Sequence, residues 1–155
     1  MTFISGLSLY FNLSRHVFGA VQQVLFPKYF SLNSFLSLIT LISFSHLSQK
    51  TEWDFNQMLQ TSVLITCFLL ELLIRLYIVP PVIHLISVKT KIEATAGVGQ
   101  EVGYCDPGAL KNCPYYTKLH SQFRRLHMIV AVGNICTMVC SALHLHSLAL
   151  QWTCL

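Results

Sequence analysis

Two oppositely charged residues stand inside an apolar run, where charge is costly. Glu71 and Arg75 are four positions apart in the stretch Leu59–Val79, and the acid is N-terminal to the base. In a helix this spacing and order place the two side chains on one face and favour an ion pair. A charge within a membrane span also marks a candidate functional site. We expect a structural pair whose members neutralise each other, or alternatively an ion or proton path.

A second pattern consists of soft metal-ligand side chains at helical spacing. Cys136, Cys140 and His144 follow one another in the apolar run Met128–Leu150. Thiolate and imidazole ligands suit copper(I), zinc and similar metals. Small side chains on one helix stripe are equally what close helix packing requires. Because no Cys-x-x-Cys pair or charged ligand accompanies them, we predict packing and no metal site, with these three residues as weak candidates.

A third pattern is a pair of basic motifs, each beside an apolar run. They are Arg15-His16 before the first long run and Arg124-Arg125-Leu126-His127 before the last. Basic residues near a membrane surface attract anionic lipid headgroups by about 1 kcal/mol each. The same residues also set topology and anchor helix ends, which is the interpretation that we favour. No Ser-His-Asp order, P-loop, dinucleotide fingerprint or HExxH motif occurs. The sequence therefore predicts no catalytic residue and no cofactor.

The elements that must position these residues follow from the composition. Only 10% of the 155 residues are charged and 54% are hydrophobic, whereas a soluble domain carries about 25% charged residues. This composition predicts an integral membrane protein with a single domain over residues 1–155. Runs of about 20 apolar residues are long enough to cross a bilayer as helices. We expect such spans at about 30–47, 59–79 and 128–150.

Two further apolar segments precede the first span. Met1–Phe11 is about half the length needed to cross a bilayer, so it resembles the second half of a helix whose first half is missing. Apolar residues then recur at helical spacing from Leu13 to Leu25, which predicts an interfacial amphipathic helix ended by Pro27. The predicted fold is an all-α, multi-pass transmembrane helix bundle with three full spans, one partial span and one interfacial helix.

The orientation follows from the uneven distribution of basic residues. One side of the predicted membrane holds eight Lys and Arg residues, six of them in the loop 89–127, and the opposite side holds only Lys50. Cytosolic loops carry the excess of basic residues, so this loop is predicted to be cytosolic. Within it, Gly97-Val98-Gly99 and Asp106-Pro107-Gly108 predict breaks, and Tyr115–His127 predicts a helix that continues into the last span.

Several motifs resemble those of a known family of small membrane proteins. They are Thr2-Phe3-Ile4-Ser5-Gly6, Ser14-Arg15-His16-Val17-Phe18-Gly19, Leu25-Phe26-Pro27, Ile92-Glu93, Gly97-Val98-Gly99 and Phe123-Arg124-Arg125-Leu126-His127. They extend over nearly the whole chain and resemble the transmembrane protein 205 family. The resemblance implies a four-helix multi-pass protein of secretory-pathway membranes, with a poorly defined molecular function and an association with resistance to platinum drugs. The match is poor around Glu71–Val79.

We therefore expect a non-enzymatic protein of secretory-pathway or plasma membranes that acts in trafficking or partner binding. Its expected partners are the lipid bilayer, anionic lipid headgroups and other copies or subunits in an oligomer. The alternative is a small transporter or efflux component for a cation, metal or drug that uses intramembrane polar residues. The net charge of +4 is spread along the chain, which argues against nucleic-acid binding because that requires a basic face or stripe.

Overall fold

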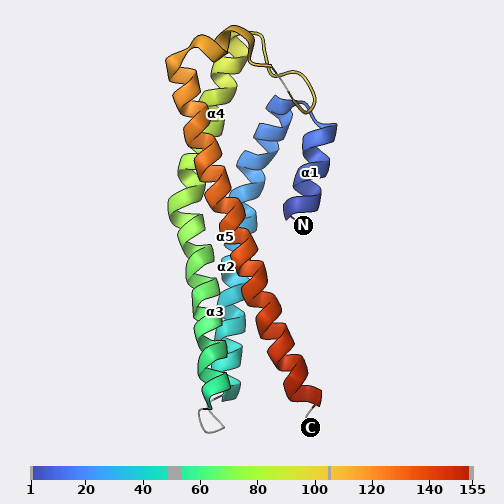
Figure 1. The fold of residues 1–155 in the computed structure, drawn as a ribbon, viewed down its shortest axis with the longest axis vertical. Coiled ribbons are helices and arrows are strands. Elements are labelled where there is room, and N and C mark those ends of the chain that lie inside the picture. Colours follow the sequence, from blue (N-terminus) through green and yellow to red (C-terminus); the bar gives the residue numbers. More distant parts are fainter. Residues whose placement is uncertain (1, 49–53, 105, 154–155) are drawn as a thin grey trace. The chain divides into compact units, whose positions relative to one another are not determined.

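The chain is helical throughout most of the part that the structure describes. The computed structural model describes residues 2–48, 54–104 and 106–153, so the prediction that involves Lys50 lies outside the described residues. The helices are α1 (Thr2–Asn12), α2 (Arg15–Ser48), α3 (Phe55–Leu73), the π-helix η1 (Ile74–Ile78), α4 (Val79–Thr95), the 3₁₀-helix η2 (Gly108–Asn112) and α5 (Pro114–Thr153) (Figure 1). The described ranges contain no β-strand, which confirms the all-α class.

Contacts between residues divide the chain into two compact units. The first unit consists of the residues up to Pro27 together with Val79–Met128, and the second of Lys28–Ile78 together with the residues from Ile129 onwards. Helices α2 and α5 contribute to both units. The boundaries coincide with Pro27 and with the end of η1, and prolines and π-turns are features that interrupt the regular hydrogen bonding of a helix.

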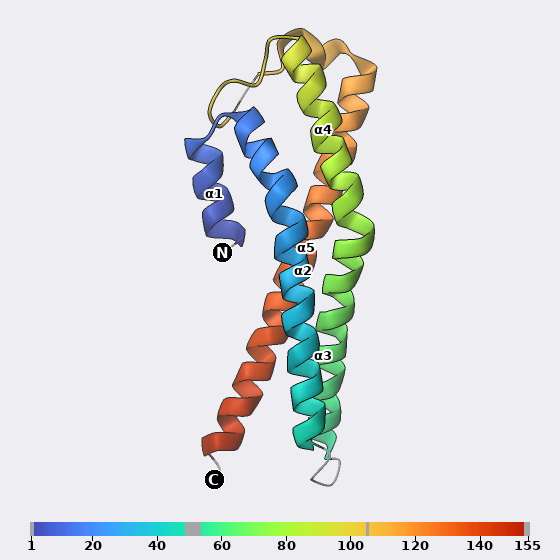
Figure 2. The same ribbon diagram turned by 180° about the vertical axis from the view of Figure 1, so that it is seen from behind.

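In the first unit, α4 runs beside the first part of α5 in both views (Figures 1 and 2). Val82 and Ile86 of α4 and Leu119 of α5 are buried. Gly19 of α2 lies so close to α4 that an added β-carbon would be 3.3 Å from a methyl carbon of Ile86. The absence of a side chain at this position therefore allows α2 and α4 to approach each other.

In the second unit, α3 lies beside the second part of α2 (Figures 1 and 2), and α5 contacts both helices. Tyr29 OH of α2 donates a hydrogen bond to Asn134 Oδ1 of α5 at 3.2 Å, and Cys67 Sγ of α3 lies 3.9 Å from Thr137 O of α5. The buried side chains of this unit include many polar groups. They are Ser34, Gln60, Glu71, Asn134, Thr137 and His144.

The outer surface is apolar, unlike the surface of a soluble protein. Leu69 of α3 is 48% exposed and Met138 of α5 is 58% exposed. Three helical segments of the described residues, Arg15–Leu47, Phe55–Thr95 and Pro114–Leu150, are long and apolar enough to cross a membrane. Polar groups inside and apolar groups outside are the arrangement that a lipid environment favours. These features are those of a multi-pass membrane protein.

The helices are longer than a bilayer requires. Helix α5 has 40 residues, which corresponds to about 60 Å at the usual rise per residue. The hydrocarbon core of a bilayer is about 30 Å thick. A substantial part of α5 therefore extends beyond the hydrocarbon core, and polar sites on that part are accessible to headgroups and water.

The prediction that Pro27 ends a helix is wrong. Helix α2 continues through Pro27 to Ser48, so the predicted amphipathic segment forms its first part. Proline lacks the N–H for one helical hydrogen bond, but the buried side chains on either side of it, Phe26 and Phe30, hold the helix by packing. In a membrane-spanning helix a proline is tolerated where neighbouring helices and local adjustments of the backbone satisfy the freed backbone group.

The predicted breaks in the loop are confirmed. Helix α4 ends at Thr95, and Gly97 and Gly99 follow with φ values of 69° and 98°, which favour glycine. The backbone N–H of Gly108 donates to Asp106 Oδ1 at 3.1 Å, and this turn leads into η2. The predicted helix from Tyr115 is α5, which continues through the last apolar run.

Candidate functional site

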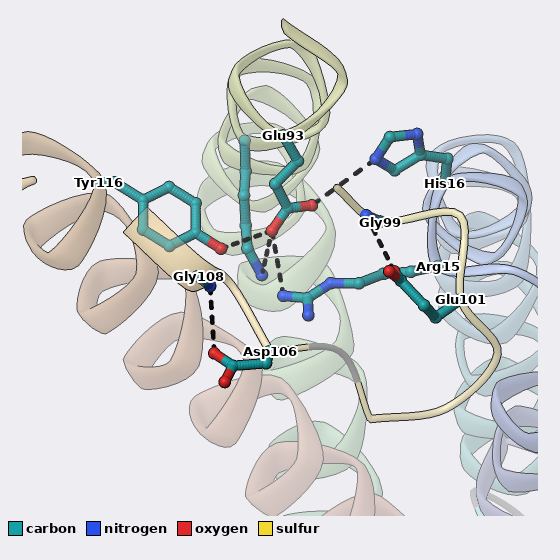
Figure 3. A network of polar contacts seen from close by, with 9 residues as sticks. Arg15, His16, Glu93, Gly99, Glu101, Asp106, Gly108 and Tyr116 are labelled. Atoms are coloured by element: carbon teal, nitrogen blue, oxygen red, sulfur yellow. Dashed lines mark hydrogen bonds and ion pairs between the residues drawn. The ribbon is translucent and has the colours of Figure 1, made fainter. Parts of the chain in front are cut away.

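A network of polar contacts in the first unit surrounds Glu93 of α4 (Figure 3). The carboxylate is buried, and its Oε1 accepts a hydrogen bond from Tyr116 OH of α5 at 2.5 Å and lies 3.1 Å from Arg15 Nη2 of α2. Lys89 Nζ, one helical turn before Glu93, lies 3.8 Å from the same oxygen. His16 Nε2 lies 3.9 Å from Oε2. These partners offset the cost of burying the carboxylate.

Backbone contacts with the loop after α4 hold the start of α2 at this network. Arg15 N donates to Glu101 O at 3.1 Å and His16 N donates to Gly99 O at 3.3 Å. The Glu101 side chain in turn accepts from Gly99 N at 3.1 Å (Figure 3). Gly99 packs against the His16 ring so closely that a β-carbon would overlap it. The loop therefore requires glycine at this position, for both its φ value and its space.

The network lines a pocket of about 450 Å³ in the first unit. Four cationic side chains line it, namely those of Arg15, Lys89, Lys111 and Arg124, together with the carboxylate of Glu93. Because that carboxylate already contacts Arg15, Lys89 and Tyr116, the pocket has an excess of positive charge. Aromatic side chains complete the wall, and Lys89 Nζ lies 5.1 Å from the centroid of the Phe123 ring. Such a pocket is suited to an anionic group.

An exposed ion pair lies at the edge of this pocket. Lys111 Nζ is 2.7 Å from Asp106 Oδ1. The hydrogen bond from Lys111 and the backbone N–H of Gly108 lower the pKa of Asp106, and the hydrogen bond to Asp106 raises the pKa of Lys111. The charge of Lys111 is therefore partly balanced, whereas Arg124 contributes an exposed guanidinium to the pocket.

The structure brings three of the five predicted interface residues to the pocket or its network. Arg15 and His16 contact Glu93, and Arg124 lines the pocket. Arg125 is exposed and is not among the lining residues. The His127 ring stacks with two phenylalanine rings, and its centroid lies 6.4 Å from that of Phe26 and 5.6 Å from that of Phe123. Its place is thus in packing rather than in the pocket.

Sequence reasoning missed the centre of this site. Glu93, Lys89 and Tyr116 were not among the predicted site residues, although Glu93 belongs to one of the family-like motifs. The signal available in the sequence is the spacing of Lys89 and Glu93, four residues apart on α4. Neither the motif Arg15-His16 nor the motif Ile92-Glu93 indicates that Arg15 and Glu93 form an ion pair, because the two residues are far apart in the sequence.

The predicted intramembrane pair lies in the second unit, where its members contact different partners. Glu71 Oε2 accepts a hydrogen bond from Ser37 Oγ at 2.7 Å, and Arg75 Nε donates to Ser31 Oγ at 2.7 Å. Among the described residues the two side chains form no ion pair with each other. The reason is η1, which begins at Ile74. A π-turn has more residues per turn than an α-helix, so positions four apart no longer share one face.

The three weak metal candidates do not converge. Cys136 is exposed, Cys140 is intermediate in exposure, and His144 is buried with its ring edge-on to Phe44 at 5.3 Å between centroids. No group of three or more His, Cys, Asp or Glu residues that could hold a metal ion occurs in the ranges that the structure describes. In an α-helix a step of four residues turns the direction by about 40° beyond a full turn, so the stripe rotates away from one face.

Comparisons with known proteins match most of the chain. The family model described as "Domain of unknown function (DUF4149)" matches residues 1–89, which is more than half of the chain and includes Arg15, His16 and Lys89. The chain is also similar to transmembrane protein 205 of Danio rerio, with 27% identity over 156 residues that cover 97% of this chain and 83% of that protein. No solved structure matches the chain significantly.

Proposed function

The chain belongs to the family defined by the domain of unknown function DUF4149, and from this premise we propose a binding function for it. It acts as a non-enzymatic, multi-pass component of secretory-pathway membranes, in trafficking or in the recruitment of a partner. The pocket around Glu93 holds the phosphate headgroup of an anionic lipid. The observation that carries this proposal is the set of four cationic side chains and one engaged carboxylate lining a single pocket.

The size and chemistry of the pocket support this ligand. Its volume of about 450 Å³ falls within the range of about 300–1,000 Å³ that is usual for small-ligand sites. Arginine binds phosphate oxygens with two parallel hydrogen bonds, and Arg124 is placed in the wall with its charge exposed. The engaged Glu93 fixes Arg15 and Lys89 in position, so little side-chain order is lost on binding.

The predicted orientation places the cationic pocket at the cytosolic leaflet, which contains the anionic lipids. Most of the basic residues of the chain lie in the loop 89–127 and near Arg15, and the basic side of a membrane protein is cytosolic. The cytosolic leaflet is also the leaflet rich in anionic lipids. A cationic pocket on that side therefore meets its ligand at high local concentration.

A binding measurement on the purified full chain tests the proposal. Short-chain phosphatidylinositol 4-phosphate, phosphatidylserine and phosphatidylcholine are titrated in neutral detergent and monitored by native mass spectrometry. We expect both anionic lipids to bind more tightly than phosphatidylcholine, and Arg124→Gln to weaken their binding by about tenfold, because a charge-assisted pair contributes about 1.5–3 kcal/mol.

The neighbouring residue gives a matched control. Arg125→Gln removes the same charge from an exposed position that does not line the pocket, so it is expected to leave binding nearly unchanged. Equal losses in the two variants would point to unspecific attraction at the membrane surface and would contradict the pocket. In cells, a proximity-labelling enzyme inserted at Gly108 is expected to label secretory-pathway membrane proteins, with a label set changed by Arg124→Gln and not by Arg125→Gln.

A second candidate function is transport of a cation, metal or drug. It is favoured by the buried carboxylate of Glu71, which lies in a three-helix unit with several other polar side chains. Flux into liposomes that contain the full chain tests it, with Glu71→Gln as the variant and Asp54→Asn, an exposed helix cap, as the control. Flux that depends on Glu71 alone would favour transport, and flux equal to that of empty liposomes would exclude it for the ion tested.

A further inference from the structure

A second pocket, of about 400 Å³, lies entirely within the second unit and outside the site described above. One wall comes from the first turns of α3 and the other from the last turns of α5. The lining residues are Asn56, Leu59, Gln60, Val63, Leu143, His144, Ser147 and Leu150. Their spacing of three and four residues along each helix shows that one stripe of α3 faces one stripe of α5 across the pocket.

Two deeply buried polar groups in this wall lack hydrogen-bond partners in the described structure. Gln60 is 5% exposed and its Oε1 has no partner, and His144 is 7% exposed and its Nδ1 has none. Leaving a buried polar atom without a partner is unfavourable, because its desolvation is not compensated. Because both residues line the same pocket, a ligand placed there is a candidate hydrogen-bond partner for these two atoms.

The lining determines the chemistry of that ligand. Among the residues that the structure describes, no Asp, Glu, Lys or Arg lines the pocket, and the polar lining groups are two amides, a hydroxyl and an imidazole. A charged ligand would therefore meet no counter-charge from these residues, which makes its burial costly. A hydroxyl group is able to donate to Gln60 Oε1 and to accept from His144 Nδ1–H. Leucines and a valine form the rest of the wall, and they are suited to a hydrocarbon chain or ring.

The pocket, with a volume of about 400 Å³, is too large to be filled by one or two water molecules. One water accounts for about 30 Å³, and waters against leucine side chains would lack polar partners. The pocket also lies near a membrane surface, because α3 begins at Phe55, directly after the charged cap Asp54. The hydroxyl groups of neutral lipids lie at this depth. We propose that the pocket binds an uncharged lipid through its hydroxyl headgroup, with Gln60 and His144 as the recognising residues.

Photo-crosslinking of the purified full chain tests this proposal. The probes are photoactivatable, clickable forms of cholesterol, a dialkylglycerol alcohol and phosphatidylcholine, which carry the same reactive group. We expect one or both hydroxyl lipids to label peptides from residues 56–63 and 143–150, and an excess of the unlabelled lipid to compete. The two hydroxyl probes distinguish a sterol from a glycerolipid. Equal labelling by phosphatidylcholine would show contact with bulk lipid and would overturn the proposal.

Substitutions separate recognition from folding. Gln60→Leu and His144→Phe preserve approximate shape while removing the hydrogen-bonding atoms, and each is expected to reduce labelling about fivefold, the effect of one hydrogen bond. Leu143→Trp fills the pocket and is expected to abolish labelling, whereas Leu145→Trp, at a position 65% exposed on the same helix, leaves it unchanged. Monodisperse elution of each variant shows that it is folded. Undiminished labelling in folded Gln60→Leu and His144→Phe would overturn the assignment of these residues.

Discussion

Gly99 combines two requirements that only glycine meets. Its φ value of 98° is unfavourable for any other residue, and a β-carbon would overlap the His16 ring. Gly97 also has a positive φ value, 69°, but an added β-carbon there meets nothing within 4 Å. We expect Gly97→Ala to cost only backbone strain, about 1–2 kcal/mol, and Gly99→Ala to cost about 1–3 kcal/mol more because of overpacking. Thermal unfolding in detergent measures both, and equal losses would contradict the contact with His16.

The exposed pair Asp106–Lys111 gives a prediction for pH. Lys111 lowers the pKa of Asp106, so the contribution of the pair to stability is complete above the ordinary carboxyl range and disappears as the pH falls through the lowered value. The pKa of Lys111 is raised, so the pair persists until the pH exceeds the ordinary lysine range. Carbon-13 NMR titration of Asp106 is expected to give a lower pKa in the natural chain than in Lys111→Gln, and identical values would show that the pair does not form in solution.

At the scale of single residues, the sequence identifies some residues of the polar network around Glu93 but not which residues contact each other. Arg15 and His16 were recognised because charged residues beside apolar runs are unusual. Glu93, the ion-pair partner of both residues, could not be identified, since it stands in an ordinary mixture of polar residues in the segment Lys89–Thr95. The contact depends on how the loop at Gly99 returns to the start of α2, which is a tertiary feature without a local pattern.

At the scale of helices, the approach of α5 to η1 depends on Gly133. A β-carbon added to Gly133 would overlap the Ile74 side chain, chiefly its terminal methyl carbon. We expect Gly133→Ala to lower the free energy of unfolding by about 1–3 kcal/mol because of overpacking, and the melting temperature falls accordingly. In an Ile74→Val background that methyl group is absent, so the same substitution is expected to cost less. A double-mutant cycle of thermal unfolding checks this, and an unchanged cost in the Ile74→Val background would show that another contact limits the approach.

The π-helix leads to a prediction about the two intramembrane charges. Because Glu71 and Arg75 hydrogen-bond to different serines of α2, the effects of Glu71→Gln and Arg75→Met on stability are expected to add within about 0.5 kcal/mol. By contrast, Arg75→Met and Ser31→Ala remove the same hydrogen bond and are expected to be non-additive. Denaturation of the single and double variants measures both cycles. A coupling well above 1 kcal/mol between positions 71 and 75 would show that they pair directly.

The helices themselves were largely predictable, and the exceptions have physical causes. Long runs without charge, such as Met128–Leu150, indicate helices because a lipid environment requires internally satisfied backbone groups. The continuation of α2 through Pro27 was not predicted, because packing of the neighbouring phenylalanines competes with a local rule. The π-turn before Pro80-Pro81 was likewise hidden, since its apolar residues Ile74 and Ile78 fit either kind of helix.

At the scale of the whole chain, one contact constrains topology independently of charge. Ser14 forms an isolated bridge with Val102, and Arg15 N donates to Glu101 O. The start of α2 and the loop after α4 therefore lie on the same side of the membrane. The basic residues of that loop predict that this side is cytosolic. The residues around Ser14 and the loop after α4 must therefore be assigned to the same side of the membrane.

The glycan acceptor Asn12-Leu13-Ser14 makes this link testable. Taken alone, the sequon predicts a glycan on the secretory side, but the bridge from Ser14 to Val102 brings it to the side of the loop 89–127. The Asn12 side chain also donates to Ser8 O at 2.7 Å within α1. We expect no glycosidase-sensitive mobility shift at Asn12 or at an acceptor tag inserted at Gly108, and a shift at an acceptor tag appended after Leu155. Shifts at both Asn12 and Gly108, the former abolished by Asn12→Gln, would show that the orientation is reversed. A shift at only one of these two positions would contradict the contact between the start of α2 and the loop.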